Sequence, residues 1–282
     1  MNAIAAAFVA ACRDELEEPK PGNVHVFAEG HGMTVADFMV SAEAAAPALS
    51  DPALSVGARI RAGVEATFRA VNINTNLGIL LLCAPLAAAA ERGGDLRLAL
   101  RATLAGLTRA DAADAFKAIV RASPAGLGEA PRHDVREIPE VTLLQAMREA
   151  AGRDRIAYQY SHDFVDVYET GLPALTGWKV QDWGRPWPVV RSYLSFLAGF
   201  PDSHIARKHG KAAALEVQAQ ASKLLERYKN TVSSEDALGD LLSFDAWLKS
   251  AGLNPGTSAD LTVATVFAER LTRLLIEGRN DG

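Results

Sequence analysis

Cysteine is scarce in this chain, which has only Cys12 and Cys83 among its 282 residues and no Cys-x-x-Cys pattern. This excludes a disulfide framework and a thiolate metal site, and it favours a reducing cytoplasm. Aromatic residues make up 7% of the chain and the formal net charge is −5. The basic, aromatic-rich composition of a nucleic-acid-binding protein is therefore missing.

Long hydrophobic runs are missing as well. The most apolar stretch, residues 77–90, contains Pro85, whereas a membrane span needs about 20 apolar residues. We interpret this stretch as a buried helix. The first residues have no Lys or Arg before a short apolar run, which is not the pattern of a secretion signal. No membrane partner is expected.

Apolar residues recur at helical spacing, as in Ile60, Val64, Phe68 and Val71, and strand-like alternation is hard to find. The dipeptide Asp51-Pro52 predicts a helix start. Further starts are predicted by pairs with capping-box spacing, namely Thr34 with Asp37, Thr108 with Asp111, Ser233 with Asp236 and Thr257 with Asp260. We predict an all-α protein of about ten or more helices, forming a single globular domain over residues 1–282 with long polar loops at the site.

Two segments interrupt the helical pattern. Residues 123–139 are rich in Pro and Gly, and residues 176–188 contain Trp178, Trp183 and Trp187. The tryptophan segment could form a lid or a packed corner. We favour the corner, because large aromatic side chains usually belong to the core.

The standard signatures of nucleotide-binding loops, zinc proteases and serine hydrolases are absent from the sequence. This disfavours the common nucleotide-binding and hydrolase folds. His204 and His209 are also poor co-ligands for one metal, because five positions on a helix separate them by about 140° around its axis.

Two proline-glycine loops are the most informative features of the chain. The first is residues 18–23 (Glu-Pro-Lys-Pro-Gly-Asn) and the second is residues 254–260 (Asn-Pro-Gly-Thr-Ser-Ala-Asp). Proline fixes φ and glycine permits unusual φ, which suits a backbone that approaches a ligand. Their polar side chains suit phosphate and Mg²⁺ handling. Each also has a structural interpretation, for example Asp202 and Asp260 as helix caps.

Together these segments resemble the triphosphoribosyl-dephospho-coenzyme A synthase family. Segments 18–23, 38–42, 74–78, 202–210 and 254–261 occur in the order found in that family, over about residues 17–267. The resemblance implies a mainly helical enzyme that breaks the bond between ribose and adenine in ATP. The triphosphoribosyl group would then move to a ribose hydroxyl of dephospho-coenzyme A, with Mg²⁺ as cofactor and ATP as substrate.

The resemblance also implies roles for individual residues. Glu65 and Asp202 are the expected catalytic carboxylates. The expected magnesium ligands are Asp202, Asp260 and Asn74. The expected nucleotide and phosphate ligands are Lys20, Asn23, His31, Asn74, Asn76, Arg207, Lys208 and Ser258.

The chain departs from the family pattern in several places, including Gly32, where the family has Asp before the early Met, and the middle of the chain, where the family's His-Gly-Glu segment has no clear counterpart. Asn76 and Leu77 stand where the family has His and Lys, which removes a cation and a proton carrier. A divergent member acting on another phosphorylated intermediate, as in tetrahydromethanopterin-type one-carbon cofactor biosynthesis, therefore remains an alternative. A non-catalytic helical binding protein is another. In the enzyme interpretations the partners are a small nucleotide and a phosphorylated acceptor, and a homodimer is compatible with the sequence.

Overall fold

Helices account for the regular structure of this chain. The computed structural model describes residues 1–124, 127–128, 132–177, 187–230 and 234–280. Over these residues it has fourteen α-helices, one π-helical turn and two isolated β-bridges, and no strand. The predicted all-α class is confirmed.

The chain divides into two compact units, and neither is continuous in sequence. Unit 1 comprises Met1–Cys12, Ala36–Phe164 and Phe267–Gly282, and unit 2 comprises Arg13–Val35 and Val165–Val266. Helices α1 (Ala3–Glu17) and α14 (Gly256–Asn280) each contribute residues to both units. One domain over residues 1–282 stays a prediction.

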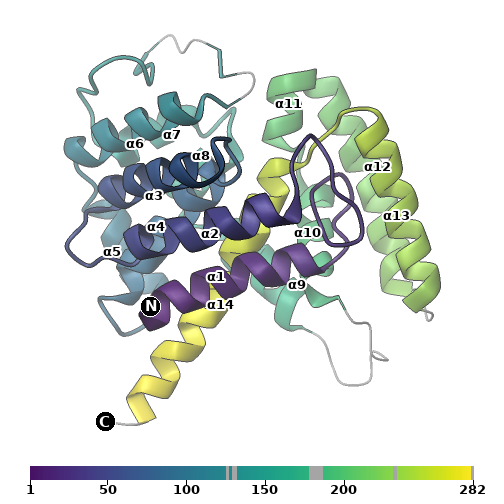
Figure 1. Ribbon diagram of the computed structural model, residues 1–282, viewed down its shortest axis with the longest axis horizontal. Helices are drawn as coiled ribbons and strands as arrows, with labels where there is room; N and C mark the ends of the chain where they lie inside the picture. The colour runs from purple at the N-terminus through teal and green to yellow at the C-terminus, as the bar shows by residue number, and fades with distance from the viewer. Residues whose placement is uncertain (125–126, 129–131, 178–186, 231–233, 281–282) are drawn as a thin grey trace. The chain divides into compact units, whose positions relative to one another are not determined.

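Unit 1 is a set of helices packed around α4. It holds most of α2 (Val35–Leu49) and all of α3 (Val56–Val71), α4 (Leu77–Ala90), α5 (Leu96–Ala105), α6 (Arg109–Ala122), α7 (Leu143–Ala150) and α8 (Arg155–Ser161) (Figure 1). Helix α3 packs on α4 and α6, and α4 packs on α5. Nearly every residue of α4 is buried, as predicted. No helix in the described residues is long and apolar enough to cross a membrane.

Helix α6 starts as its sequence predicts. Thr108 accepts the backbone N–H of Asp111, and the Asp111 carboxylate accepts the N–H of Thr108, which completes a capping box. Oδ1 of Asp111 also accepts the N–H of Gly57 at 2.8 Å. Any side chain at position 57 would collide with the backbone of Asp111. One cap therefore also fixes the approach of α3 to α6.

Two predicted helix starts are wrong. Asp51 accepts the N–H of Ala53 in a turn, and α3 begins only at Val56 after its cap Ser55. Thr257 lies inside the first turn of α14, because this helix begins at the glycine before it. The pair at positions 233 and 236 includes a residue outside the described part of the chain.

Unit 2 contains η1 (Val167–Gly171), α9 (Leu172–Thr176), α10 (Pro188–Gly199), α11 (Ser203–His209), α12 (Lys211–Asn230), α13 (Ser234–Ser250) and the first part of α14. Helix α12 packs on α10 and α11. Trp187 packs against the apolar core of this unit, which agrees with a packed corner. Trp178 and Trp183 lie outside the described residues.

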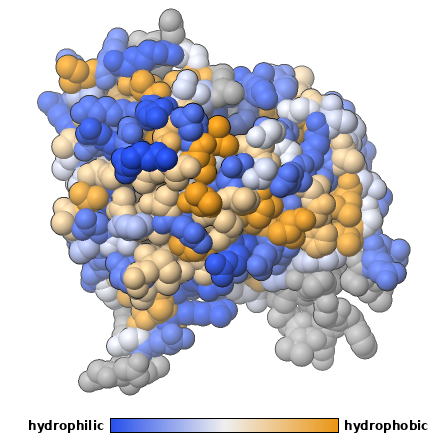
Figure 2. Space-filling model, viewed as in Figure 1, coloured by the Kyte–Doolittle hydropathy of each residue, from blue (hydrophilic) through white to orange (hydrophobic). Residues whose placement is uncertain are grey.

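Both polar and apolar residues reach the surface on the face shown in Figure 2. Exposed apolar side chains such as Leu98 and Leu215 lie on different helices, α5 and α12. Isolated exposed apolar residues are normal for a folded protein. The informative residues are therefore the buried polar ones.

Candidate active site

The two proline-glycine loops meet in unit 2. The side chain of Asn23 donates a hydrogen bond from Nδ2 to Oδ1 of Asn254 at 2.9 Å. Both side chains are buried, at 5% and 8% exposure. Segments that are 231 positions apart therefore form one local structure.

Lys20 is completely buried inside the first loop. Its Nζ lies 2.5 Å from Oε1 of Glu15, and it donates to the carbonyl of Val24 at 2.8 Å and to Oδ1 of Asn23 at 3.2 Å. Burial raises the pKa of Glu15 and lowers the pKa of Lys20, while their mutual attraction opposes both shifts. An ammonium group has three N–H donors, and these three acceptors use them all. In this conformation Lys20 orders the loop and has no donor left for a phosphate.

Gly22 is the point where the first loop packs most tightly. Its φ is +82°, and an added Cβ would lie 2.7 Å from Cδ of Pro255 and 2.8 Å from Cδ1 of Leu248. Only glycine fits both the backbone conformation and the space. Its N–H donates to Oδ1 of Asp245 at 2.8 Å, and its carbonyl accepts from Nε2 of His31, also at 2.8 Å.

Asp245 on α13 gathers donors from the first loop. Besides Gly22 it contacts Nζ of Lys249 at 2.9 Å and lies 3.3 Å from Nε2 of His25. Burial acts to raise its pKa, but these donors outweigh burial and lower it. His25 is fully buried, and burial lowers its pKa. Its Nε2 lacks the alignment of a hydrogen bond and its Nδ1 has no hydrogen-bond partner in the described residues.

Asp202 joins the starts of two helices. Its Oδ1 accepts the N–H groups of His204 at 2.9 Å and Ile205 at 3.2 Å, which caps α11. Its Oδ2 accepts both the N–H and the Oγ–H of Ser258 on α14, each at 2.8 Å. Burial raises the pKa of Asp202 in spite of these donors. The structural interpretation of Asp202 as a cap is therefore correct, and Ser258 turns its N–H toward this carboxylate.

Positive charge collects around His204. Its imidazole packs on the backbone of Gly256, where an added Cβ would lie 3.0 Å from Nδ1. Burial first, and then the charges of Arg207, Lys208, His31 and His209, lower the pKa of His204 to about 4. Arg207 is partly buried and Lys208 is exposed. This segment of unit 2 is suited to an anion.

A family model described as ATP:dephospho-CoA triphosphoribosyl transferase (CitG) matches residues 1–278. This chain belongs to that family. A curated relative from Stutzerimonas stutzeri (strain A1501), named "Probable 2-(5''-triphosphoribosyl)-3'-dephosphocoenzyme-A synthase", is 26% identical over 214 residues. The match covers 76% of this chain and 63% of that relative, so the chain spans less than two thirds of the relative's length.

A solved structure supports the same family relation. It comes from Archaeoglobus fulgidus and is provisionally titled a triphosphoribosyl-dephospho-coA synthase. Its TM-score is 0.64 at 25% identity, and the match covers 81% of this chain and 95% of that chain. The resemblance drawn from the polar segments is thereby confirmed.

Glu65, one of the two carboxylates expected to be catalytic in this transferase family member, lies on α3 in unit 1. Its Oε2 is 3.8 Å from Nε of Arg121, and both side chains are more than 40% exposed. An exposed pair at this distance contributes little stability. Glu65 is therefore accessible, although it already has a cationic neighbour.

Asn74 and Asn76 organise the start of α4, also in unit 1. Oδ1 of Asn74 accepts the N–H of Leu77 at 3.2 Å. Asn76 is 4% exposed and exchanges hydrogen bonds with Thr67 at 2.9 and 3.1 Å. The residue that replaces the family histidine thus has a buried structural partner.

The residues expected to hold Mg²⁺ do not fit a preformed site. Both oxygens of Asp202 accept hydrogen bonds, and Oδ1 of Asn74 accepts from a backbone N–H. Asp260 lies partly buried in α14, after its first turn, and has partners of its own. Within the described residues, no group of three His, Cys, Asp or Glu side chains could hold a metal ion. These residues therefore give no ligand set for Mg²⁺.

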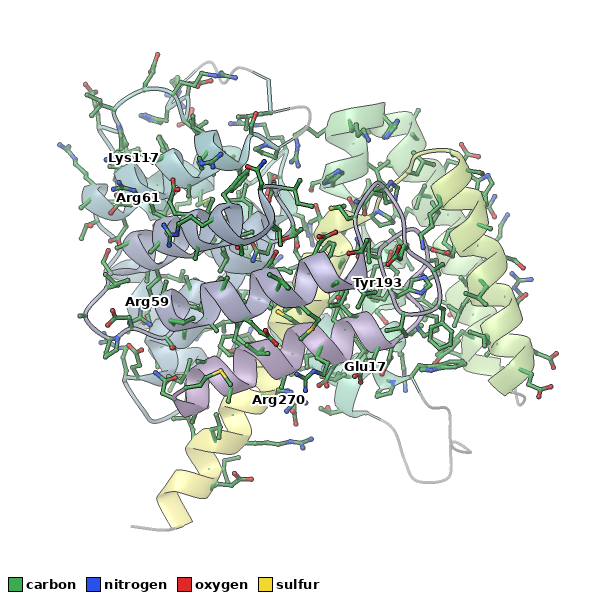
Figure 3. All side chains as sticks on the ribbon, viewed as in Figure 1. Glu17, Arg59, Arg61, Lys117, Tyr193 and Arg270 are labelled. Carbon is green, nitrogen blue, oxygen red and sulfur yellow. The ribbon has the colours of Figure 1, made fainter. Side chains whose placement is uncertain are left out.

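Sequence reasoning missed several residues that shape the site. The Glu18 carboxylate accepts the N–H of Val190 at the start of α10, and burial raises the pKa of Glu18 to about 8. Tyr193 on α10 donates from its hydroxyl to the carbonyl of Pro21 at 2.5 Å, and Figure 3 shows it beside the loop that follows α1. Tyr193 and Asp245 sit in ordinary helical patterns, so no local signal marked them.

Proposed function

We propose that this protein transfers the 5-triphosphoribosyl group of ATP to dephospho-CoA or a related acceptor and releases adenine, in prosthetic-group or cofactor biosynthesis. The observation that carries the proposal is the match of residues 1–278 to the transferase family. The names of the two relatives describe the same activity.

In this proposal the charged segment of α11 binds the triphosphate. Arg207 and Lys208 supply positive charge beside His204, and Arg side chains suit phosphate oxygens particularly well. Asn23 and Ser258 act by holding the two loops, through Asn254 and Asp202 respectively. Holding the polyphosphate fixes the ribose, which is the main requirement for substitution at its anomeric carbon.

Breaking the ribose-adenine bond develops positive charge at the ribose carbon. The catalytic roles of Glu65 and Asp202 require them to turn toward substrate. Asp202 would have to give up donors from two helices, whereas Glu65 would only have to leave an exposed ion pair. Of these two carboxylates, Glu65 is therefore the more accessible.

The decisive experiment measures free adenine by chromatography after the protein is incubated with ATP, Mg²⁺ and dephospho-CoA. Adenine formed only when protein and acceptor are both present would support the proposal. ATP binding without adenine release would refute the reaction and favour the alternative of a divergent member acting on another phosphorylated intermediate. No binding of ATP would refute the nucleotide substrate itself.

A matched pair of variants tests the phosphate ligands. Arg207→Ala should weaken ATP binding by about 1.5–3 kcal/mol, the usual scale of a hydrogen bond to a charged group. Arg227→Ala removes the same side chain from α12, where it pairs with Asp240 at 3.6 Å and is 63% exposed. Equal ATP affinity in the two variants would rule out Arg207 as a ligand.

We propose that Mg²⁺ binds only together with ATP, since the described residues supply no set of three His, Cys, Asp or Glu ligands and phosphates commonly provide ligands to this ion. Calorimetric titration of the ATP-free protein with MgCl₂ should therefore show no binding. We also propose a cytoplasmic location, because Cys12 and Cys83 are buried and form no disulfide. A homodimer stays a prediction that sedimentation would test.

A further inference from the structure

His31, which follows the first loop, has a backbone conformation that is uncommon for residues other than glycine. Gly30 and Met33 form a β-bridge, with the N–H of Met33 donating to the carbonyl of Gly30 at 3.0 Å. Between them, His31 has a φ of +57° and Gly32 has a φ of +71°. Two positive φ values in a two-residue turn are the pattern of type I′, which prefers Asn or Gly at its first central position. A strained residue in such a place suggests that its side chain has a use.

The imidazole of His31 has a defined tautomer. Its Nε2 lies 2.8 Å from the carbonyl oxygen of Gly22, which can only accept a hydrogen bond. Nε2 therefore carries the proton, and the neutral ring keeps a lone pair on Nδ1. The side chain is partly exposed, and the described residues provide no hydrogen-bond partner for Nδ1. This nitrogen is available to accept a proton.

Four other titratable side chains of unit 2 around this loop are either hydrogen-bonded or fully buried. Asp202 accepts four hydrogen bonds, Asp245 holds Gly22 and Lys249, and Glu18 accepts a backbone N–H. His25 is fully buried. Among these groups His31 combines an open lone pair with partial exposure.

We propose that His31 is the general base of the transfer reaction, with Nδ1 as the accepting atom. This inference rests on the proposed function. The acceptor hydroxyl gives its proton to Nδ1 as its oxygen bonds to the anomeric carbon of the ATP ribose. The bond from that carbon to adenine breaks, and its electron pair leaves with adenine. The imidazolium then returns the proton to adenine, directly or through water, so that His31 is regenerated.

The charged groups around His31 come from two helices. The charge of His31 acts on His204 of α11, and Lys249, paired with Asp245, packs against the neighbouring Gly30 from α13. A base must be neutral to accept a proton, so the rate should fall as pH decreases and an imidazole becomes protonated. Replacing His31 should therefore change the acidic limb of the pH-rate profile.

Two substitutions distinguish the loss of the His31 imidazole as a base from a disturbance of the backbone turn. His31→Asn suits the positive φ of the turn, and His31→Gln retains a side-chain N–H that can reach the carbonyl of Gly22. Each should lower kcat by about 10² to 10⁴-fold, the usual contribution of a general base. The Kd for ATP, measured by calorimetry, should change less than about twofold. The acidic limb should disappear from the residual activity of both variants. His162→Gln in unit 1 is the control, and it should leave both quantities unchanged.

Thermal unfolding should show that His31→Asn is at least as stable as the parent, which excludes misfolding as the cause of a low rate. Unchanged kcat and an unchanged acidic limb would overturn the inference while leaving the proposed function intact. A weakened Kd for ATP with normal kcat would overturn it in favour of a phosphate ligand. A parent that forms no adenine would overturn the proposed function, and this inference with it.

Discussion

Nδ2 of Asn23 and Oδ1 of Asn254 lie 2.9 Å apart, which joins the loop after α1 to the segment before α14. The same Asn23 accepts from Lys20 through Oδ1. The side-chain amide of Asn23 therefore links the buried ammonium group of Lys20 to the second loop. This arrangement makes the geometry of both loops sensitive to single changes.

Removing either asparagine should destabilise the protein. We expect Asn23→Ala and Asn254→Ala each to lower the free energy of unfolding by about 1–3 kcal/mol, because each leaves a buried polar partner unsatisfied. The double variant should cost less than the sum of the two. Urea denaturation of the four proteins measures this coupling, and simple additivity would contradict the contact.

Two glycines with positive φ provide a matched test of packing. An added Cβ at Gly32 (φ +71°) meets nothing within 4 Å, whereas one at Gly22 (φ +82°) meets Pro255 and Leu248. Gly32→Ala should cost about 1–2 kcal/mol through its backbone alone. Gly22→Ala should cost about 1–3 kcal/mol more. Equal thermal unfolding midpoints would show that the loops are not in contact at this point.

The buried pair of Lys20 and Glu15 predicts a stability effect rather than a pure binding effect. Lys20→Met removes the cation and leaves a buried carboxyl without it, which should cost about 3–5 kcal/mol. Adding Glu15→Gln should recover part of that loss. Denaturant titration of the single and double variants measures this. A stable Lys20→Met protein with weakened ATP affinity would instead restore Lys20 as a phosphate ligand.

The buried carboxyl of Glu18 predicts that the stability of the protein changes with pH between about 4.5 and 8. Its pKa rises from 4.5 to about 8 on folding, so the folded state holds the proton more tightly. The contribution is fully present below pH 4.5 and is lost as pH rises through 8, by up to about 5 kcal/mol. Glu18→Gln should lack this loss, so its stability relative to the parent should grow over this range.

The neighbouring Glu17→Gln is the control, since this side chain is exposed. Its stability relative to the parent should stay nearly flat across the same pH range. A flat difference for Glu18→Gln as well would mean that the Glu18 carboxyl is not buried as described.

The helical fold could be predicted from the sequence because helix periodicity and caps are local. Thr108 and Asp111 illustrate this, since three positions contain the whole signal. Asp51-Pro52 carries a similar signal and failed, because a turn with Ala53 uses the same carboxylate. The same local pattern can start a helix or form a turn, and the packing of the rest of the chain decides which of the two forms.

The candidate site was predictable only in part. The Pro and Gly residues of the two loops made the loops recognisable in the sequence. The roles of their side chains, however, depend on partners that are distant in the sequence. Lys20 looked like a phosphate ligand until Glu15 and Val24 were seen to use its donors. Asp245 carried no signal at all, because its partner Gly22 is 223 positions away.

Unit 2 is discontinuous in sequence, which affects the order in which its parts are synthesised and can fold. Residues 13–35 are synthesised early, but the other residues of their unit begin only at position 165. Until then the growing chain must carry Lys20 and Gly22 without the helices that complete their surroundings. A fragment beginning at residue 165 would lack the first loop altogether. Supplying residues 13–35 as a separate peptide should then aid its refolding, which makes this unit a candidate for fragment complementation.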